Sequence, residues 1–225
     1  MRRRFCGGTS HISDMLENGI WVITLYDGII KGDMYDNRFI TPGMICVIED
    51  NIRFCYREFN VSDYTPVKWI EGISRIQDIP YVGDKDLARL DYDGKGNSRR
   101  IMELYGDYNT AAKNLHETQQ WSYENRTIHP YLMSCGELDL VIRWQNDIAH
   151  VESTAWWYNG ISRITLNTKE IWTSTLCDSV TAYLLYNKQY ISLSNINNKK
   201  YCYPIYDVDE SIYLIYGDDN PPIIG

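Results

Sequence analysis

The sequence predicts an α+β protein in which helices pack on antiparallel sheets. Short runs rich in β-branched and aromatic residues fill residues 20–70 and again residues 171–206, and such runs between turn residues are typical of β-strands. Between them, two stretches place helix-capping residues in front of an apolar helical face. The 19 tyrosines, against four phenylalanines, suit half-buried sheets, because tyrosine joins an apolar ring to a hydroxyl.

Four strands are expected in a β-rich N-terminal section. They are Ile20–Tyr26, Met44–Ile48, Ile52–Tyr56 and Val67–Ile70. Asp50 and Asn51 separate the second strand from the third, and both residue types tolerate the positive φ of a tight hairpin turn. Cys46 and Cys55 lie on the two sides of this hairpin, where their thiols can face each other. Buried free thiols are the commoner state of such residues in a reducing compartment.

The stretch Asp91–Asn97 is expected to be a turn. Asp91 and Asp93 resemble the start of a calcium loop, but the next ligand position holds Lys95 and the twelfth holds Met102 in place of glutamate. A cation bound there would lack both a charge and a bidentate ligand. A glycine turn is therefore the favoured interpretation.

Two helices are expected next. The first, Ala111–His116, follows Asp107–Thr110, which offers several N-cap residues. The second begins at Ser134, and Glu137 completes a capping box in which hydroxyl and carboxylate each meet an unpaired backbone amide. The apolar face of this helix is marked by Leu138, Val141, Ile142 and Ala149 and is interrupted by Gln145.

Four further strands and two terminal arms complete the prediction. The strands are Ile171–Ser174, Ala182–Tyr186, Tyr190–Ser194 and Tyr201–Tyr206. The expected organisation is an N-terminal arm (1–17), a β-rich section (18–90), a main domain (91–206) and a C-terminal arm (207–225).

Charge and hydropathy argue against two classes of partner. The net charge is −8 and the only basic run is Arg2–Arg4, whereas gripping phosphate needs a cationic stripe, so no nucleic-acid partner is expected. No apolar run is long enough to cross a bilayer, so membrane insertion is not expected. No apolar segment follows the basic N-terminus, so a cleaved signal peptide is not expected. A chain folded inside a cell and delivered in a particle fits this pattern.

From Asp93 to Ile205, short motifs occur in a characteristic order. They are Asp93-Gly94 with Asn97-Ser98 and Ile101, then Ala111-Ala112, Ser134-Cys135-Gly136-Glu137-Leu138, Trp172-Thr173-Ser174-Thr175, Ala182-Tyr183 and Tyr203-Pro204-Ile205. In this order they resemble the C-type-lectin-like domain of gut-bacterial surface adhesins and phage tail proteins. The resemblance covers roughly half of the chain. It implies two helices packed on antiparallel sheets and a surface that binds without performing chemistry.

Two positions depart from the family pattern. Met133 stands where a proline normally precedes the helix, and Tyr203 stands where the last strand normally carries an arginine, so the packing of that corner is expected to differ. The Glu-Pro-Asn, Gln-Pro-Asp and Trp-Asn-Asp motifs of calcium-dependent lectins do not occur, and Trp144-Gln145-Asn146-Asp147 falls on a predicted helix. A calcium-dependent lectin mechanism is not expected.

No catalytic, metal or cofactor site is predicted. The histidines are scattered without the spacing of a metal site: His11, His116, His129 and His150. His129 and Cys135 could act as base and nucleophile, but Cys135 lies in the first turn of a capped helix, which favours a packed thiol. The prediction is a protein that is not an enzyme.

A ligand-binding surface is predicted at the ends of the last hairpins. Tyrosine and asparagine gather there as they do in antibody paratopes. The predicted residues are Trp157, Tyr186, Asn187, Lys188, Gln189, Tyr190, Asn195, Asn197 and Asn198. The alternative is that tyrosines at every second position only line one face of a sheet.

Two hypotheses from different classes follow. In the first, the chain is a phage virion protein, of the tail or tail fibre, that recognises a glycan or a protein on the host surface. In the second, it is a structural virion subunit whose arms dock onto other virion subunits. A homo-oligomer is expected. A bacterial surface adhesin is a third option, disfavoured by the missing export signal.

Overall fold

The structure is a computed structural model that describes residues 12–36, 38–39, 43–56, 65–154, 170–186 and 190–225. Its strands are β1 (Gly19–Thr24), β2 (Ile29–Lys31), β3 (Gly43–Glu49), β4 (Ile52–Tyr56), β5 (Val67–Lys68), β6 (Trp121–Tyr123), β7 (Arg126–Ile128), β8 (Tyr131–Leu132), β9 (Ile171–Leu176), β10 (Thr181–Tyr186), β11 (Tyr190–Asn195), β12 (Lys199–Lys200), β13 (Pro204–Asp207) and β14 (Ile223–Ile224). Its helices are η1 (Ile12–Met15), η2 (Gly32–Met34), α1 (Lys85–Ala88), α2 (Gly94–Tyr105), α3 (Ala111–Thr118), α4 (Cys135–Arg143), α5 (Gln145–Thr154) and α6 (Val208–Tyr216). The fold is α+β, as predicted. None of the helices described is both long and apolar enough to cross a membrane.

Strands that are far apart in the chain join in one large sheet. Its order is β14-β2-β1-β3-β4-β13-β8, and its pairs are antiparallel except that β14 runs parallel to β2. A smaller sheet, β11-β10-β9, and the ribbons β12-β5 and β6-β7 are separate from it. The large sheet thus combines strands from the predicted N-terminal section, main domain and C-terminal arm.

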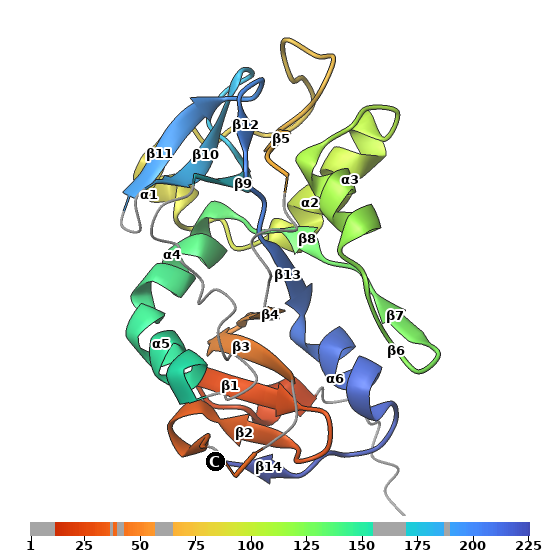
Figure 1. Ribbon diagram of the computed structural model, residues 1–225. Helices are drawn as coiled ribbons and strands as arrows, with labels where there is room; N and C mark the ends of the chain where they lie inside the picture. Colours follow the sequence, from red (N-terminus) through yellow and green to blue (C-terminus); the bar gives the residue numbers. More distant parts are fainter. Residues whose placement is uncertain (1–11, 37, 40–42, 57–64, 155–169, 187–189) are drawn as a thin grey trace, which may run out of the picture.

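Both faces of the large sheet are covered by helices. Ile20 and Val22 of β1 share a core with residues of α4 and α5, whereas Trp21 and Ile23 share another core with residues of α6. Figure 1 shows these helices on opposite sides of the sheet. Because successive side chains of a strand point to opposite faces, a strand covered on both sides is apolar along its whole length. This is why every residue of β1 is buried.

Local sequence signals predict the main hairpin and a helix start correctly. Strands β3 and β4 form, and Asp50 in their turn has a φ of 55°. The capping box of α4 also forms: Glu137 N donates to the Ser134 hydroxyl, and Ser134 N donates to Glu137 Oε2 at 2.7 Å. The single helix predicted beyond it is instead divided into α4 and α5 at Trp144, whose indole N–H donates to Glu49.

The two cysteines of the hairpin face each other as anticipated. Cys46 and Cys55 are direct cross-strand partners, with their Sγ atoms 2.6 Å apart. Both thiols are free and fully buried. Burial, together with the neighbouring Cys46 thiol, raises the pKa of Cys55 well above its usual value, so this thiol stays protonated.

The predicted C-terminal arm is wrong, because residues 207–225 form helix α6 and strand β14. Asp207 caps α6 by accepting a hydrogen bond from Glu210 N at 3.0 Å. The backbone N–H of Ile29 donates to the carbonyl of Pro222 at 2.9 Å, and this bond leads into the pairing of β14 with β2. The segment therefore completes the large sheet and covers one of its faces.

The predicted N-terminal arm is wrong over its last residues, 12–17. Leu16 is buried in the same core as residues of α6. The guanidinium of Arg53 on β4 lies 2.6 Å from both Ser13 Oγ and Asp14 Oδ1 and so holds η1 against the sheet. Residues 1–11 lie outside the described part of the chain.

The turn predicted at residues 91–97 is wrong as well, because helix α2 begins there. Asp93 caps this helix by accepting from Gly96 N at 2.9 Å. Gly94 occupies the first position of α2, where a Cβ would overlap the carboxylate of Glu137 and lie 2.8 Å from Ser134 N. The glycine that suggests a turn thus allows the start of α2 to pack closely against the start of α4.

Asp91 connects several of the sequence motifs. Its backbone carbonyl accepts from Gly136 N at 2.8 Å, and its Oδ2 accepts from Thr175 Oγ1 at 2.6 Å and from Asn97 Nδ2 at 2.9 Å. Thr175 Oγ1 also accepts from Cys135 N at 2.9 Å. These bonds join the starts of α2 and α4 to strand β9.

Replacing Thr175 by valine removes the central hydroxyl while keeping the side-chain shape. The variant is expected to lose about 2–3 kcal/mol of unfolding free energy, because the Asp91 carboxylate and the Cys135 amide each lose a partner. Urea unfolding followed by circular dichroism measures this loss. Thr127→Val, at an exposed position of β7, is the matched control and should change stability by less than about 0.5 kcal/mol. Equal effects of the two variants would contradict the role given to Thr175.

Candidate functional site

The described members of the predicted ligand-binding set lie at two opposite ends of one hairpin. Tyr186 ends β10 and Tyr190 begins β11 at one end of the hairpin, whereas Asn195 ends β11 at the other and precedes Asn197 and Asn198. At about 3.4 Å per residue, the six residues of β11 separate the two groups by about 17 Å. The remaining predicted residues lie outside the described residues: Trp157, Asn187, Lys188 and Gln189.

The three asparagines are exposed, and the side chains of Asn195 and Asn198 and the backbone N–H of Asn197 form hydrogen bonds within their own turn. Asn195 Oδ1 accepts from Asn197 N at 2.9 Å, and Asn198 Nδ2 donates to Ser194 Oγ at 2.9 Å. Asparagine commonly stabilises turns in this way. Turn formation therefore accounts for these residues without a ligand.

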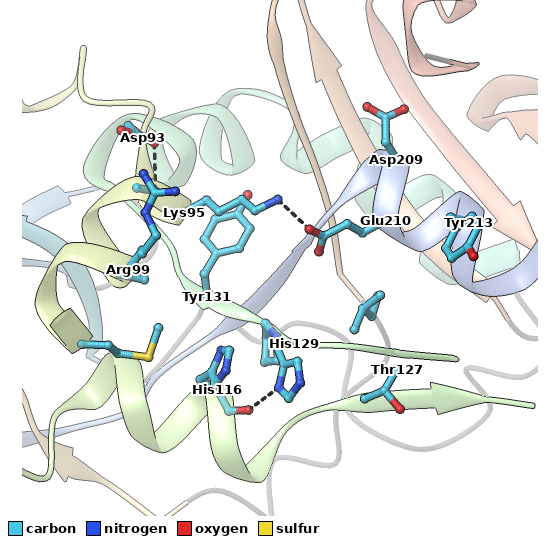
Figure 2. A pocket seen from close by; sticks show the side chains of 15 residues that line it. Asp93, Lys95, Arg99, His116, Thr127, His129, Tyr131, Asp209, Glu210 and Tyr213 are labelled. Atoms are coloured by element: carbon cyan, nitrogen blue, oxygen red, sulfur yellow. Dashed lines mark hydrogen bonds and ion pairs between the residues drawn. The ribbon is translucent and has the colours of Figure 1, made fainter. Parts of the chain in front are cut away.

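A cleft gathers a second set of side chains, from segments that are far apart in the sequence. It lies between α2, α3, α6 and the segment 127–131, and its volume is about 810 Å³, within the roughly 300–1,000 Å³ usual for small-ligand sites. Helix α2 contributes Lys95 and Arg99, and α6 contributes Asp209, Glu210 and Tyr213. Figure 2 shows Lys95 and Glu210 directed toward each other near Tyr131 and two histidines, whereas the carboxylate of Asp209 is directed away from them. The cleft thus combines both signs of charge with aromatic rings.

Lys95 connects the two helical walls of the cleft. Its Nζ lies 2.8 Å from Glu210 Oε1 and 3.0 Å from Asp207 Oδ2, and Figure 2 shows it reaching from α2 to α6. Partial burial lowers the pKa of Lys95, but the two carboxylates outweigh this effect and raise that pKa above its usual value. The lysine therefore stays charged and holds Glu210 in place.

His116 and His129 form a stacked pair at one side of the cleft. Their ring centroids are 4.2 Å apart and their planes differ by 16°. His129 Nδ1 lies 3.0 Å from the His116 carbonyl oxygen, and because a carbonyl only accepts, this nitrogen carries a proton. Burial, and secondarily the charge of His129, lowers the pKa of His116. His116 is therefore largely neutral at neutral pH, and the two stacked rings offer a flat aromatic surface.

A buried carboxylate lies behind the cleft wall. Tyr131 lines the cleft, and its hydroxyl donates to Glu137 Oε1 at 3.2 Å. Burial raises the pKa of Glu137 to about 8, although hydrogen bonds from Ser134 and Tyr131 act in the opposite direction. Glu137 is therefore largely protonated below pH 8, unlike an exposed glutamate.

The Cys135 thiol is packed in the interior. It is fully buried and shares a core with Ala88, Tyr183 and Ile191. Burial raises its pKa to about 12, so the nucleophilic thiolate is scarce at neutral pH. Within the part of the chain that the structure describes, no three His, Cys, Asp or Glu side chains are grouped so as to hold a metal ion.

Comparison of the chain with protein-family models, with curated protein sequences and with solved structures finds no match. Several residues of the sequence motifs are buried in the interior of this fold. Ile101, Ala111, Trp172 and Ala182 share one core. Tyr203 packs edge-on against Tyr56 with ring centroids 6.4 Å apart. The motifs therefore hold the scaffold together, while the cleft lies beside them.

The buried Glu137 should make stability depend on pH. Its pKa is about 8 in the folded chain and near 4.5 when unfolded, so the folded state binds the proton more tightly and stability falls as pH rises from about 4.5 to 8. Urea unfolding at pH 5 and pH 8 measures this loss. In Glu137→Gln, which cannot titrate, the difference between the two pH values should shrink. An unchanged difference would contradict the assignment of the proton to Glu137.

Proposed function

We propose that the chain is a non-catalytic recognition protein of a phage virion, in the tail or tail fibre, whose cleft between α2, α3 and α6 binds a glycan on the host surface. The cleft itself carries this proposal, because it is a concave place of ligand-binding size where charged and aromatic groups from distant segments meet. The resemblance of residues 93–205 to C-type-lectin-like domains supports recognition rather than catalysis.

The chemistry of the cleft walls suits a polyhydroxylated ligand. Each sugar hydroxyl both donates and accepts hydrogen bonds, and the cleft offers the carboxylate of Glu210 as an acceptor beside Lys95 and Arg99 as donors. Tyr213, whose side chain is 52% exposed, and the exposed ring of His129 present apolar faces to the C–H face of a sugar ring. A few polar groups between aromatic faces are typical of small-ligand sites.

The other hypotheses have less support. Assembly through terminal arms is weakened because residues 12–17 and 207–225 pack on the large sheet. A host surface protein as the ligand is less well matched than a glycan, because the binding surface is a cleft. A bacterial surface adhesin would use the same binding chemistry and differ in location.

Binding of the purified chain to intact gut bacteria and to their extracted capsular glycan tests this proposal. The cleft variant is Tyr213→Ala with His129→Ala, which removes both exposed rings. We expect saturable binding by the wild-type chain, and an affinity at least about tenfold lower in the cleft variant, because loss of each aromatic contact is worth roughly 1 kcal/mol or more. Circular dichroism of each variant checks that it is folded.

The matched control is Asn195→Ala with Asn197→Ala, in the turn beyond β11. It should bind as the wild type does. Binding that is lost in the control and kept in the cleft variant would move recognition to the hairpin turns. Failure of the folded wild-type chain to bind any cell or glycan would overturn the recognition proposal.

A further inference from the structure

Strand β11 forms the edge of the small sheet among the strands that the structure describes. It pairs with β10 over six residues, and no other described strand adjoins it. Its residues, Tyr190–Asn195, include neither a charged side chain nor a proline. An edge strand presents a row of backbone N–H and C=O groups, and proteins usually protect such edges with charge, proline or short length.

The other edges in the described part of the chain are protected by burial, charge or short length. Strand β9, the other edge of the small sheet, is also six residues long and uncharged, but it is buried throughout, and its Trp172 and Ser174 amides donate to the carbonyls of Tyr201 and Met133. The large sheet ends at β8 and β14, which are two residues long each. The ribbon β12-β5 carries Lys199, Lys200 and Lys68, and the three-residue strand β7 carries Arg126. Strand β11 is long and uncharged, and its residues 192–195 are half-buried or exposed, which makes it a place where another strand can add.

The side chains of β11 alternate in a way that complements a second copy of the same strand. Ile191 and Leu193 lie opposite Leu185 and Tyr183 and so share one face of the sheet, whereas Ser192 and Ser194 lie on the other. When such a strand pairs antiparallel with itself, apolar residues can meet apolar residues and serines can meet serines. Cross-strand pairs of both kinds stabilise sheets.

We propose that β11 pairs antiparallel with β11 of a second copy of this chain, so that two three-stranded sheets become one six-stranded sheet across a two-fold axis. The contact buries Leu193, which is 49% exposed in one copy. Because β11 is uncharged, two chains with a net charge of −8 can meet there without placing like charges in contact. The interface goes beyond the proposed function, since it is independent of what the cleft binds.

The two clefts stay open in this dimer. Figure 1 shows β11 on the opposite side of the molecule from α3 and α6, which form the cleft. Each dimer therefore presents two binding sites, and simultaneous engagement of a repetitive surface raises the effective affinity.

Sedimentation velocity of the full chain over a range of concentrations tests the proposal. Wild type is expected to pass from monomer to dimer, and Leu193→Lys, which places a charge in the contact, should raise the dissociation constant at least about tenfold. The matched control is Leu104→Lys on α2, where the leucine is 46% exposed and away from β11; it should dimerise as wild type does. A wild type that stays monomeric, or two variants that dimerise equally, would overturn the proposal.

Hydrogen exchange of the wild-type chain gives a second, mutation-free test. The backbone amides of residues 190–195 that face away from β10 should become protected at concentrations where the dimer forms, while the surface of α2 should not change. This result decides the matter even if Leu193→Lys does not fold. Protection elsewhere, with none on β11, would place the interface on another surface.

Discussion

Asp91 ties together three elements that lie far apart in the sequence. Its backbone carbonyl holds the first turn of α4, and its carboxylate holds Asn97 on α2 and Thr175 on β9. Side-chain bonds to backbone amides at helix starts satisfy donors that the helices themselves leave unpaired. The packing of α2, α4 and the small sheet around one another therefore depends on a single residue, through both its backbone carbonyl and its carboxylate.

This junction also decides where the cleft lies. Ser98, Ile101 and Asn97 turn one side of α2 toward the interior, which leaves Lys95 and Arg99 of the same helix to line the cleft. Most of the motif residues thus build the scaffold, and most of the residues that line the cleft lie between and beyond the motifs. Such a scaffold tolerates changes of binding chemistry without changes of fold.

Elements with a local signature were predictable from the sequence, and elements defined by packing were not. Asp50 sets the hairpin turn and Ser134 sets the helix start through bonds within a few residues. Gly94 suggests a turn, yet it is required by the approach of Glu137 across more than forty positions, which sequence alone does not reveal. Helix α6 has a local sequence signal, the N-cap residue Asp207. The polar residues and prolines that follow the helix favoured the interpretation of this segment as an arm. The cleft has no such signal, because its walls come from separate segments.

The parallel pairing of β14 with β2 has a consequence for the order of events during synthesis. About 170 residues separate the end of β4 at Tyr56 from Ile223, which pairs with Ile29. At roughly 5–20 residues per second, the ribosome needs about 10–30 s to produce that length. Throughout this interval the nascent hairpins carry an apolar face that α6 has not yet covered. The early strands therefore keep this apolar face uncovered until α6 and β14 have been synthesised.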